Sequence, residues 1–237
     1  PRFIPTSTNV RIRVLHRMIH MRMAVNLEFK NLEFFGGAIK VEGVNILFED
    51  CEFKQLHDIT LPAHMNRGDL CTGIYTWNAE FVNCRFSEIP YVYNVKIRGI
   101  KSRVENCHFT NMDWWANPGG GAAELGNIAR YVTFENSKVG GLGGSHLMEY
   151  CRIEDFKDPC DCSGINRGAH GAPRSMTRYN WIINGPGANG IRIDGGANGA
   201  GNRRGDIHHI ITIGNNRGMR LKGCLLYTSD AADESCS

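Results

Sequence analysis

The sequence predicts an all-β fold, a single-stranded right-handed parallel β-helix (solenoid), and three observations support this. A short β-type hexapeptide recurs along the chain, a second strand type is interleaved with it, and no amphipathic helical pattern lies between them. A chain of 237 residues with 42% hydrophobic content can bury a sizeable core. The 28 glycines favour many turns over long helices.

The first repeat is a hexapeptide that commonly has Asn or Asp at its third place. Its close copies are FEDCEF (48–53), FVNCRF (81–86) and VENCHF (104–109), and looser copies start at Phe29, Phe134, Met148 and Arg178. Each copy is a short β pattern, and the irregular spacing indicates strands that persist while the loops vary. We expect the fourth-place residues Cys51, Cys84 and Cys107 to stack inward as small apolar residues.

The second repeat alternates apolar with charged residues and closes with Gly. Its copies are IKVEG, VKIRG, IRIDG and MRLKG, which begin at Ile39, Val95, Ile191 and Met219, with weaker copies at Ile74 and Ala123. This period-2 pattern is typical of a sheet that is buried on one face. We therefore expect the apolar first residues to face the core and the charged residues to point outward. Residues 139–147 fit neither repeat.

The register of the second repeat predicts a column of outward side chains. Ile191 and Met219 are 28 residues apart, so their strands can lie in register on successive coils, about 4.8 Å apart. Arg192 then lies beside Arg220, and Asp194 lies beside Lys222. The corresponding residues of earlier coils are Lys40 and Glu42, Tyr75 and Trp77, and Lys96 and Arg98.

Three regions of the chain are expected. Residues 1–25 form an N-terminal strand or cap region, residues 26–223 form the β-helix, and residues 224–237 form no domain. The last segment shares no pattern with the rest, and Cys224 to Asp233 resembles the translation of a sequencing-library adapter. No run of 18 apolar residues exists, so no membrane partner is expected.

Both repeats together resemble the pectate-lyase-like β-helix superfamily, whose coils carry N-C/S-x-F/I at a turn. The superfamily includes polysaccharide lyases, glycoside hydrolases, tailspikes and noncatalytic proteins. The resemblance implies an extracellular or periplasmic protein, with Ca²⁺ as a candidate cofactor and no assigned metal ligands. GMRLKG also resembles the R-I-K element of polygalacturonase-type hydrolases, which implies that Arg220 and Lys222 contact substrate. The paired aspartates and the GHG element of those enzymes have no counterpart in the same order here.

The outward column and the long loops beside it predict a groove for an anionic polysaccharide, uronate or sulfated. Net charge is +3, and arginines bind carboxylate or sulfate in bidentate fashion. In a lyase, such groups neutralise the uronate carboxylate while a base removes the α-proton. A lyase is favoured over a hydrolase. The predicted catalytic residues are Arg192, Arg220, Lys222 and His170, and the predicted substrate-binding residues are Asp194, Lys96, Arg98, Tyr75, Trp77, Trp114 and Trp115.

Two alternatives stay open for this column. The protein could be a noncatalytic polysaccharide-binding or adhesive, tailspike-like β-helix, or the column could be a solvated strand face on which Asp beside Lys offsets stacked like charges. Nucleic acid is not an expected partner, because no basic run is interleaved with aromatic residues. In GDIHHIITI, one of His208 and His209 should face inward, so at most one of them is a candidate acid or base.

Overall fold

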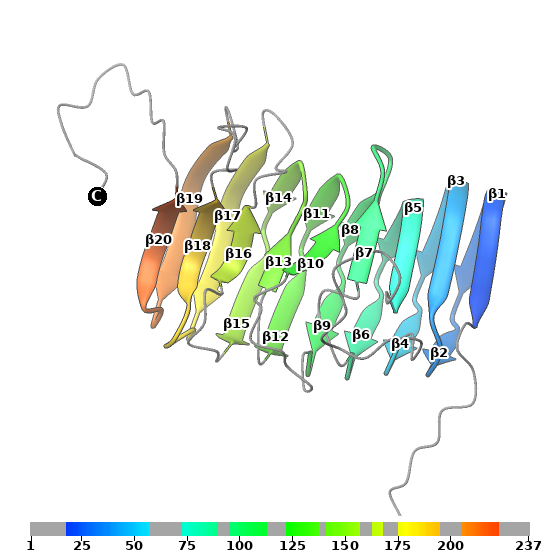
Figure 1. Ribbon diagram of the computed structural model, residues 1–237, viewed down its shortest axis with the longest axis horizontal. Coiled ribbons are helices and arrows are strands. Elements are labelled where there is room, and N and C mark those ends of the chain that lie inside the picture. Colours follow the sequence, from blue (N-terminus) through cyan, green and yellow to red (C-terminus); the bar gives the residue numbers. More distant parts are fainter. Residues whose placement is uncertain are drawn as a thin grey trace, which may run out of the picture.

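The computed structural model describes residues 18–56, 73–89, 95–112, 122–137, 141–156, 163–167, 175–194 and 205–222. These residues contain strands and turns but no helix, which confirms the all-β class. Within these ranges, one sheet of 20 strands, which does not close on itself, contains the pairings, and each pairing with a register is parallel. Figure 1 shows the strands side by side along the long axis, from β1 at one end to β20 at the other. Over the described ranges, no helix is long and apolar enough to cross a membrane.

The strand bounds follow the two repeats. In chain order the strands are β1 (Ile19–Lys30), β2 (Glu33–Phe35), β3 (Ile39–Glu49), β4 (Glu52–Lys54), β5 (Ile74–Val82), β6 (Arg85–Ser87), β7 (Val95–Arg98), β8 (Arg103–Glu105), β9 (His108–Thr110), β10 (Ala122–Leu125), β11 (Ile128–Arg130), β12 (Thr133–Ser137), β13 (Gly141–Gly143), β14 (Leu147–Glu149), β15 (Arg152–Phe156), β16 (Ser163–Arg167), β17 (Met176–Ile183), β18 (Asn189–Asp194), β19 (Asp206–Ile213) and β20 (Arg217–Lys222). Strand β1 runs across the expected boundary at residue 25.

The pairings arrange these strands in three ladders. Ladder 1 contains the first halves of β1, β3 and β5, then β7, β10, β13, β16, β18 and β20. Ladder 2 contains the second halves of β1, β3 and β5, then β8, β11, β14 and the first halves of β17 and β19. Ladder 3 contains β2, β4, β6, β9, β12, β15 and the second halves of β17 and β19. One passage of the chain through the ladders is called a rung.

The hexapeptide forms a sharp corner between ladders 2 and 3. Its third residue has a positive φ: 52° at Asp50, 55° at Asn83 and 51° at Asn106. Asn and Asp adopt this left-handed conformation more readily than most residues, and it redirects the chain. The prediction of two strand families is therefore wrong, because each close copy contributes one strand to each of two ladders.

Equivalent corner residues lie in register and form a corner column. The Asn106 Nδ2 donates to Asn83 Oδ1 at 2.8 Å. Farther along, the rings of Tyr131 and Tyr150 stack at 5.3 Å, and those of Tyr150 and Tyr179 stack at 5.2 Å. The fold thus uses amide hydrogen bonds in one half of the column and aromatic stacking in the other.

Two predicted copies of the hexapeptide are misaligned. The copy at Arg178 is shifted by one residue, because the positive φ of 55° belongs to its second residue, Tyr179. Asn136 in FENSKV does have a positive φ of 52°, but its Nδ2 donates to Asn111 Oδ1 at a different corner, after ladder 3. The true equivalent of Asn106 in that rung is Tyr131, with a φ of 52°. A tyrosine in this conformation carries no Asn or Asp signal, so the residue pattern alone favoured the wrong frame.

The core lies between the inward faces of the three ladders. Phe48 stacks on Phe81 with ring centroids 4.7 Å apart, and Phe86 stacks on Phe109 at 4.3 Å. The inward cysteine stack is confirmed, since Cys51, Cys84, Cys107 and Cys151 are buried free thiols, and the Cys84 amide donates to Cys107 Sγ. Burial raises the pKa of the Cys151 thiol to about 12.

The unassigned segment 139–147 contains a short rung. Strand β13 pairs with β10 in ladder 1, and β14 pairs with β11 in ladder 2. Gly141 makes the close approach feasible, because a Cβ there would lie 1.9 Å from the Gly164 carbonyl oxygen. The sequence Gly-Leu-Gly in β13 has no charged residue to alternate with, so neither repeat pattern could find it.

The predicted register of the second repeat is confirmed. Ile191 pairs with Met219, Arg192 with Arg220, and Asp194 with Lys222. Ile39, Val95 and Ile191 are buried, as expected. Met219 occupies the inward register but is 45% exposed, because it lies on the last described rung and no described rung covers it.

We expect the corner to distinguish side chains that adopt positive φ from those that do not. Asn106→Val should lower the free energy of unfolding by about 1 to 3 kcal/mol, because β-branched residues are strained in this conformation. Asn106→Gly should cost less than the valine variant, since glycine accepts the same φ. Urea denaturation of both variants measures the difference, and equal losses would show that the corner conformation is not what the Asn supplies.

Candidate functional site

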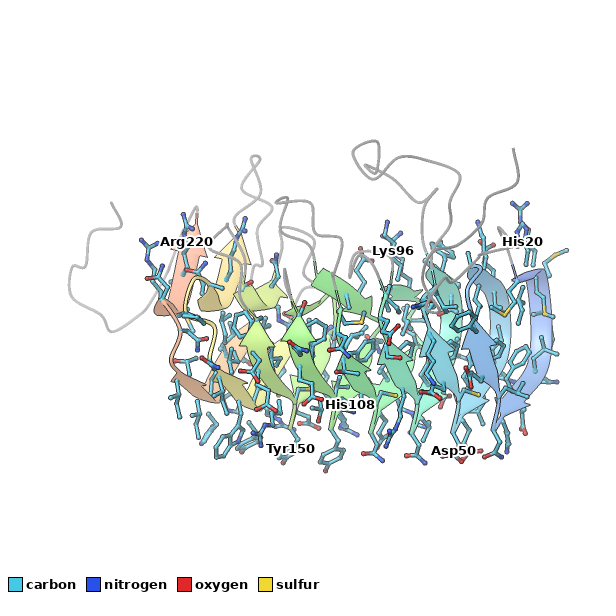
Figure 2. The ribbon with its side chains drawn as sticks, turned by 90° about the horizontal axis from the view of Figure 1, so that it is seen from below. His20, Asp50, Lys96, His108, Tyr150 and Arg220 are labelled. Atoms are coloured by element: carbon cyan, nitrogen blue, oxygen red, sulfur yellow. The ribbon has the colours of Figure 1, made fainter. Side chains whose placement is uncertain are left out.

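The outward column of ladder 1 is the candidate site and is called the stripe. Its members, in register along the molecule, are His20, Lys40, Tyr75, Lys96, Glu124, Gly143, Asn166, Arg192 and Arg220. Figure 2 shows His20, Lys96 and Arg220 along one edge of the molecule and Asp50 and Tyr150 along the opposite edge. The stripe therefore follows the long axis on one side.

Arg192 and Arg220 form the basic end of the stripe. They are direct neighbours across β18 and β20, and both side chains are half-buried. On the other side of Arg192 the register places Asn166, whose Oδ1 is buried and accepts no hydrogen bond from the described residues. Two guanidinium groups in adjacent strands concentrate positive charge, which favours binding of carboxylate or sulfate groups there.

The other end of the stripe is aromatic and internally paired. Lys40 Nζ lies 3.2 Å from Glu42 Oε1 and 5.0 Å from the centroid of the Tyr75 ring. Arg98, in the neighbouring outward column, donates two hydrogen bonds to Glu124, with Nε 2.6 Å from Oε2 and Nη2 3.1 Å from Oε1. The guanidinium group of Arg98 is thus already hydrogen-bonded to a carboxylate of the protein.

Lys96 and Trp77 differ in their access to solvent. Lys96 is only 3% exposed, although its register is outward. Trp77 is 45% exposed, in register with Glu42 and Arg98. Trp77 is therefore the member of the predicted substrate-binding set that offers an accessible aromatic surface at this end.

An outward column of ladder 2 arranges charge differently from the stripe. Lys30 Nζ lies 3.0 Å from Glu49 Oε2 on the next rung. Glu149, only 3% exposed, receives Arg130 Nε at 2.6 Å from the rung before and Arg178 Nε at 2.7 Å from the rung after. From Glu105 to Arg178 opposite charges alternate along this column, whereas the stripe places Arg192 directly beside Arg220.

The electrostatics of Glu149 follow from this arrangement. Burial by itself would raise the pKa of the carboxyl group, but the hydrogen bonds from Arg178 and Arg130 outweigh burial and hold the pKa below its usual range. The carboxylate thus stays ionised between two cations, and we assign it a structural role.

Sequence reasoning missed a buried arginine behind the stripe. Arg167 lies on the inward side of β16, in register with Ile193, and is 2% exposed. Its Nε donates to Thr177 Oγ1 at 2.7 Å, its Nη2 donates to the Met176 carbonyl at 3.1 Å, and its Nη1 donates to the Ser145 carbonyl. Burial lowers the pKa of Arg167 to about 10. The signal was its place two residues after Ile165, which period 2 assigns to the core.

Several predicted site residues lie outside the described residues. They are Trp114, Trp115 and His170. Asp194 and Lys222 are placed by the pairing of their strands, but their side chains are outside the described part. The structure thus brings together Arg192 and Arg220, and separately Tyr75, Trp77, Lys96 and Arg98, and it leaves the predicted base His170 unplaced.

The described residues also line an open hollow on ladder 2, with a volume of about 660 Å³. Its acidic residues are paired, since Glu28 lies 3.1 Å from Lys30 Nζ and Glu80 lies 2.7 Å from Arg103 Nη2. Among the residues that the structure describes, no three His, Cys, Asp or Glu side chains are grouped to hold a metal ion. These residues therefore do not fit the Ca²⁺ site that the resemblance suggests.

Comparison with known proteins adds no identification. No family model matches the chain, and no curated protein matches it. Function must therefore be argued from the stripe itself.

Glu149 should make stability depend on pH in acid. A carboxyl group whose pKa is lower in the folded state stabilises the protein above its unfolded pKa of about 4.3, and this contribution is lost as pH falls through the folded value. Thermal unfolding of the parent should therefore become steeper in its pH dependence below about pH 4.3 than that of Glu149→Gln. Identical pH profiles for the two proteins would contradict the structural role of this carboxylate.

Proposed function

We propose that the chain is a right-handed parallel β-helix of the pectate-lyase-like type. The three parallel ladders support this, because each strand pairs with its equivalent one rung away. Parallel strands need crossover connections, and such connections are right-handed in nearly all proteins. The buried column of phenylalanines and cysteines suits the same architecture.

We also propose that the stripe binds an anionic polysaccharide, with uronate or sulfate groups as its anions. The observation that carries this proposal is the register of Arg192 with Arg220. In ladder 2, the fold separates cations by Glu149, so adjacent arginines are not a requirement of the strands. Adjacent strands are about 4.8 Å apart, so two guanidinium forks there can hold neighbouring anionic groups of one extended polymer.

The aromatic end of the stripe suits the uncharged part of the same ligand. The exposed ring of Trp77 offers a flat apolar surface to a sugar ring. Tyr75 is less available, because Lys40 and Arg98 lie over its ring at 5.0 Å and 5.9 Å. A polymer along the stripe would thus contact Trp77 by stacking and the arginines by charge.

Lyase chemistry is an extension of this binding proposal. Arg192 and Arg220 would neutralise a uronate carboxylate and so acidify its α-proton, and His170 or Lys222 would remove that proton. Without such a base, the protein would be a noncatalytic binding or adhesive β-helix. An extracellular or periplasmic location suits either activity, because anionic polysaccharides are abundant there.

Binding to polygalacturonate and to a sulfated polysaccharide tests the proposal. Arg192→Gln and Arg220→Gln should each weaken binding by roughly tenfold to a hundredfold, because a charge-assisted contact is worth about 1.5 to 3 kcal/mol. The matched control is Arg152→Gln, which changes an exposed arginine of ladder 3 that pairs with Glu154. Added salt should weaken the parent's binding.

Equal affinity of the parent, Arg192→Gln and Arg220→Gln would overturn the binding proposal and leave the stripe as a solvated face. Lyase activity is measured separately, as new ultraviolet absorbance from unsaturated sugar ends. Binding that depends on both arginines without new absorbance on any tested uronate would indicate the noncatalytic alternative.

A further inference from the structure

His208 and His209 are consecutive residues whose rings meet outside the core. One of them was expected to face inward, and this prediction is wrong. His209 has a φ of 53° and follows Tyr179 in the corner column, so the chain turns at this residue. His208 is half-buried and His209 is exposed, which brings both imidazoles to the surface.

The two rings meet through their Nδ1 atoms, which lie 2.6 Å apart. The ring planes are at 79° and the ring centroids are 4.9 Å apart. At this distance, one Nδ1 carries a proton and donates it to the lone pair of the other Nδ1, because two N–H groups would repel each other. The pair therefore brings two imidazole nitrogens together, one as the N–H donor and the other as the acceptor.

Neighbouring groups orient the pair. The Tyr179 ring lies 4.9 Å from the His209 ring and edge-on to the His208 ring at 5.9 Å. Arg178 is in register with His208, but its Nε donates to Glu149, so its charge is balanced on the previous rung. Asp206 is exposed two residues before His208, on the same face of β19.

We propose that His208 and His209 bind a divalent transition-metal ion through both Nδ1 atoms, with Cu²⁺ bound more tightly than Zn²⁺. Neutral imidazole is a preferred ligand of these ions, and Cu²⁺ ranks above Zn²⁺ at nitrogen sites. Metal–nitrogen bonds of about 2.0 to 2.1 Å place two cis nitrogens of a square-planar ion about 2.9 Å apart. The pair needs to open only slightly for that geometry, and more for a tetrahedral ion.

Protons and charges balance in this binding step. In the neutral pair, the proton between the rings moves through solvent to the Nε2 of its own ring, and both Nδ1 lone pairs then face the ion. Water is available for the remaining positions. Protons compete for the same nitrogens, so binding should weaken in acid.

Cu²⁺ titration of the full chain, followed by calorimetry and by electron paramagnetic resonance, tests this site. The test variants are His208→Gln and His209→Asn, the second chosen because Asn83 and Asn106 occupy equivalent corners with positive φ. We expect the parent to bind one more Cu²⁺ ion than the double variant, and each single variant to lose at least tenfold in affinity at that site. The electron paramagnetic resonance spectrum of this Cu²⁺ ion should show coupling to nitrogen ligands.

The matched control is His108→Gln, which removes a surface imidazole that lies 2.9 Å from Glu135 and has no histidine neighbour in the sequence. It should leave the Cu²⁺ stoichiometry and affinity unchanged. Thermal unfolding without metal establishes that each variant folds, and only the parent and the control should gain stability from this ion. Equal Cu²⁺ binding by the parent and the double variant would overturn the proposal, as would an equal loss in the control.

Discussion

Parallel backbone pairing between successive rungs is the constraint on which the rest of the structure depends. Because strands pair with their equivalents, a residue placed on one rung lies about 4.8 Å from its equivalent on the next. Each residue of a strand therefore belongs to a column of equivalent residues along the molecule. Phe48 and Phe81 show the benefit, since their stacked rings extend the core from rung to rung.

The same constraint restricts which residues can occupy the corners and the outward columns. A corner must repeat its conformation on each rung, and residues with positive φ, such as Asn83 and Asn106, recur there. A charged side chain lies beside its equivalents on the neighbouring rungs. Glu149 is stabilised there because it accepts hydrogen bonds from Arg130 and Arg178. Arg167 breaks the inward pattern, but it donates its hydrogen bonds to two backbone carbonyls and a threonine hydroxyl.

Two juxtapositions carry the proposals, although like charges also share a register in ladder 3, at Glu33 and Glu52 and at Glu135 and Glu154. Arg192 beside Arg220 joins like charges, and His208 against His209 joins two imidazoles at a corner where Asn or Tyr suffices on other rungs. The first places two guanidinium groups side by side at one end of the stripe, and the second places two imidazole nitrogens within 2.6 Å of each other. The corner column, marked by Tyr150 in Figure 2, lies on the edge opposite the stripe, so the two sites can act independently.

The sequence by itself determined the ladders that have a periodic pattern. Alternation in IRIDG and MRLKG was enough to predict the pairing of Arg192 with Arg220, because period 2 leaves one register that directs both isoleucines inward. Likewise, the cysteines of the hexapeptide were assigned correctly to the core. These properties are local, since each depends on a few neighbouring residues.

Only the tertiary structure decided what depends on backbone direction and on partners from other rungs. Local pattern could not show that Tyr131 and His209 adopt the same conformation as Asn106, because positive φ there is imposed by the stack. Nor could it show that Arg98 is taken by Glu124, or that both rings of His208 and His209 point outward. Side-chain spacing along a strand is a property of the sequence, whereas the partner across the ladder is a property of the fold.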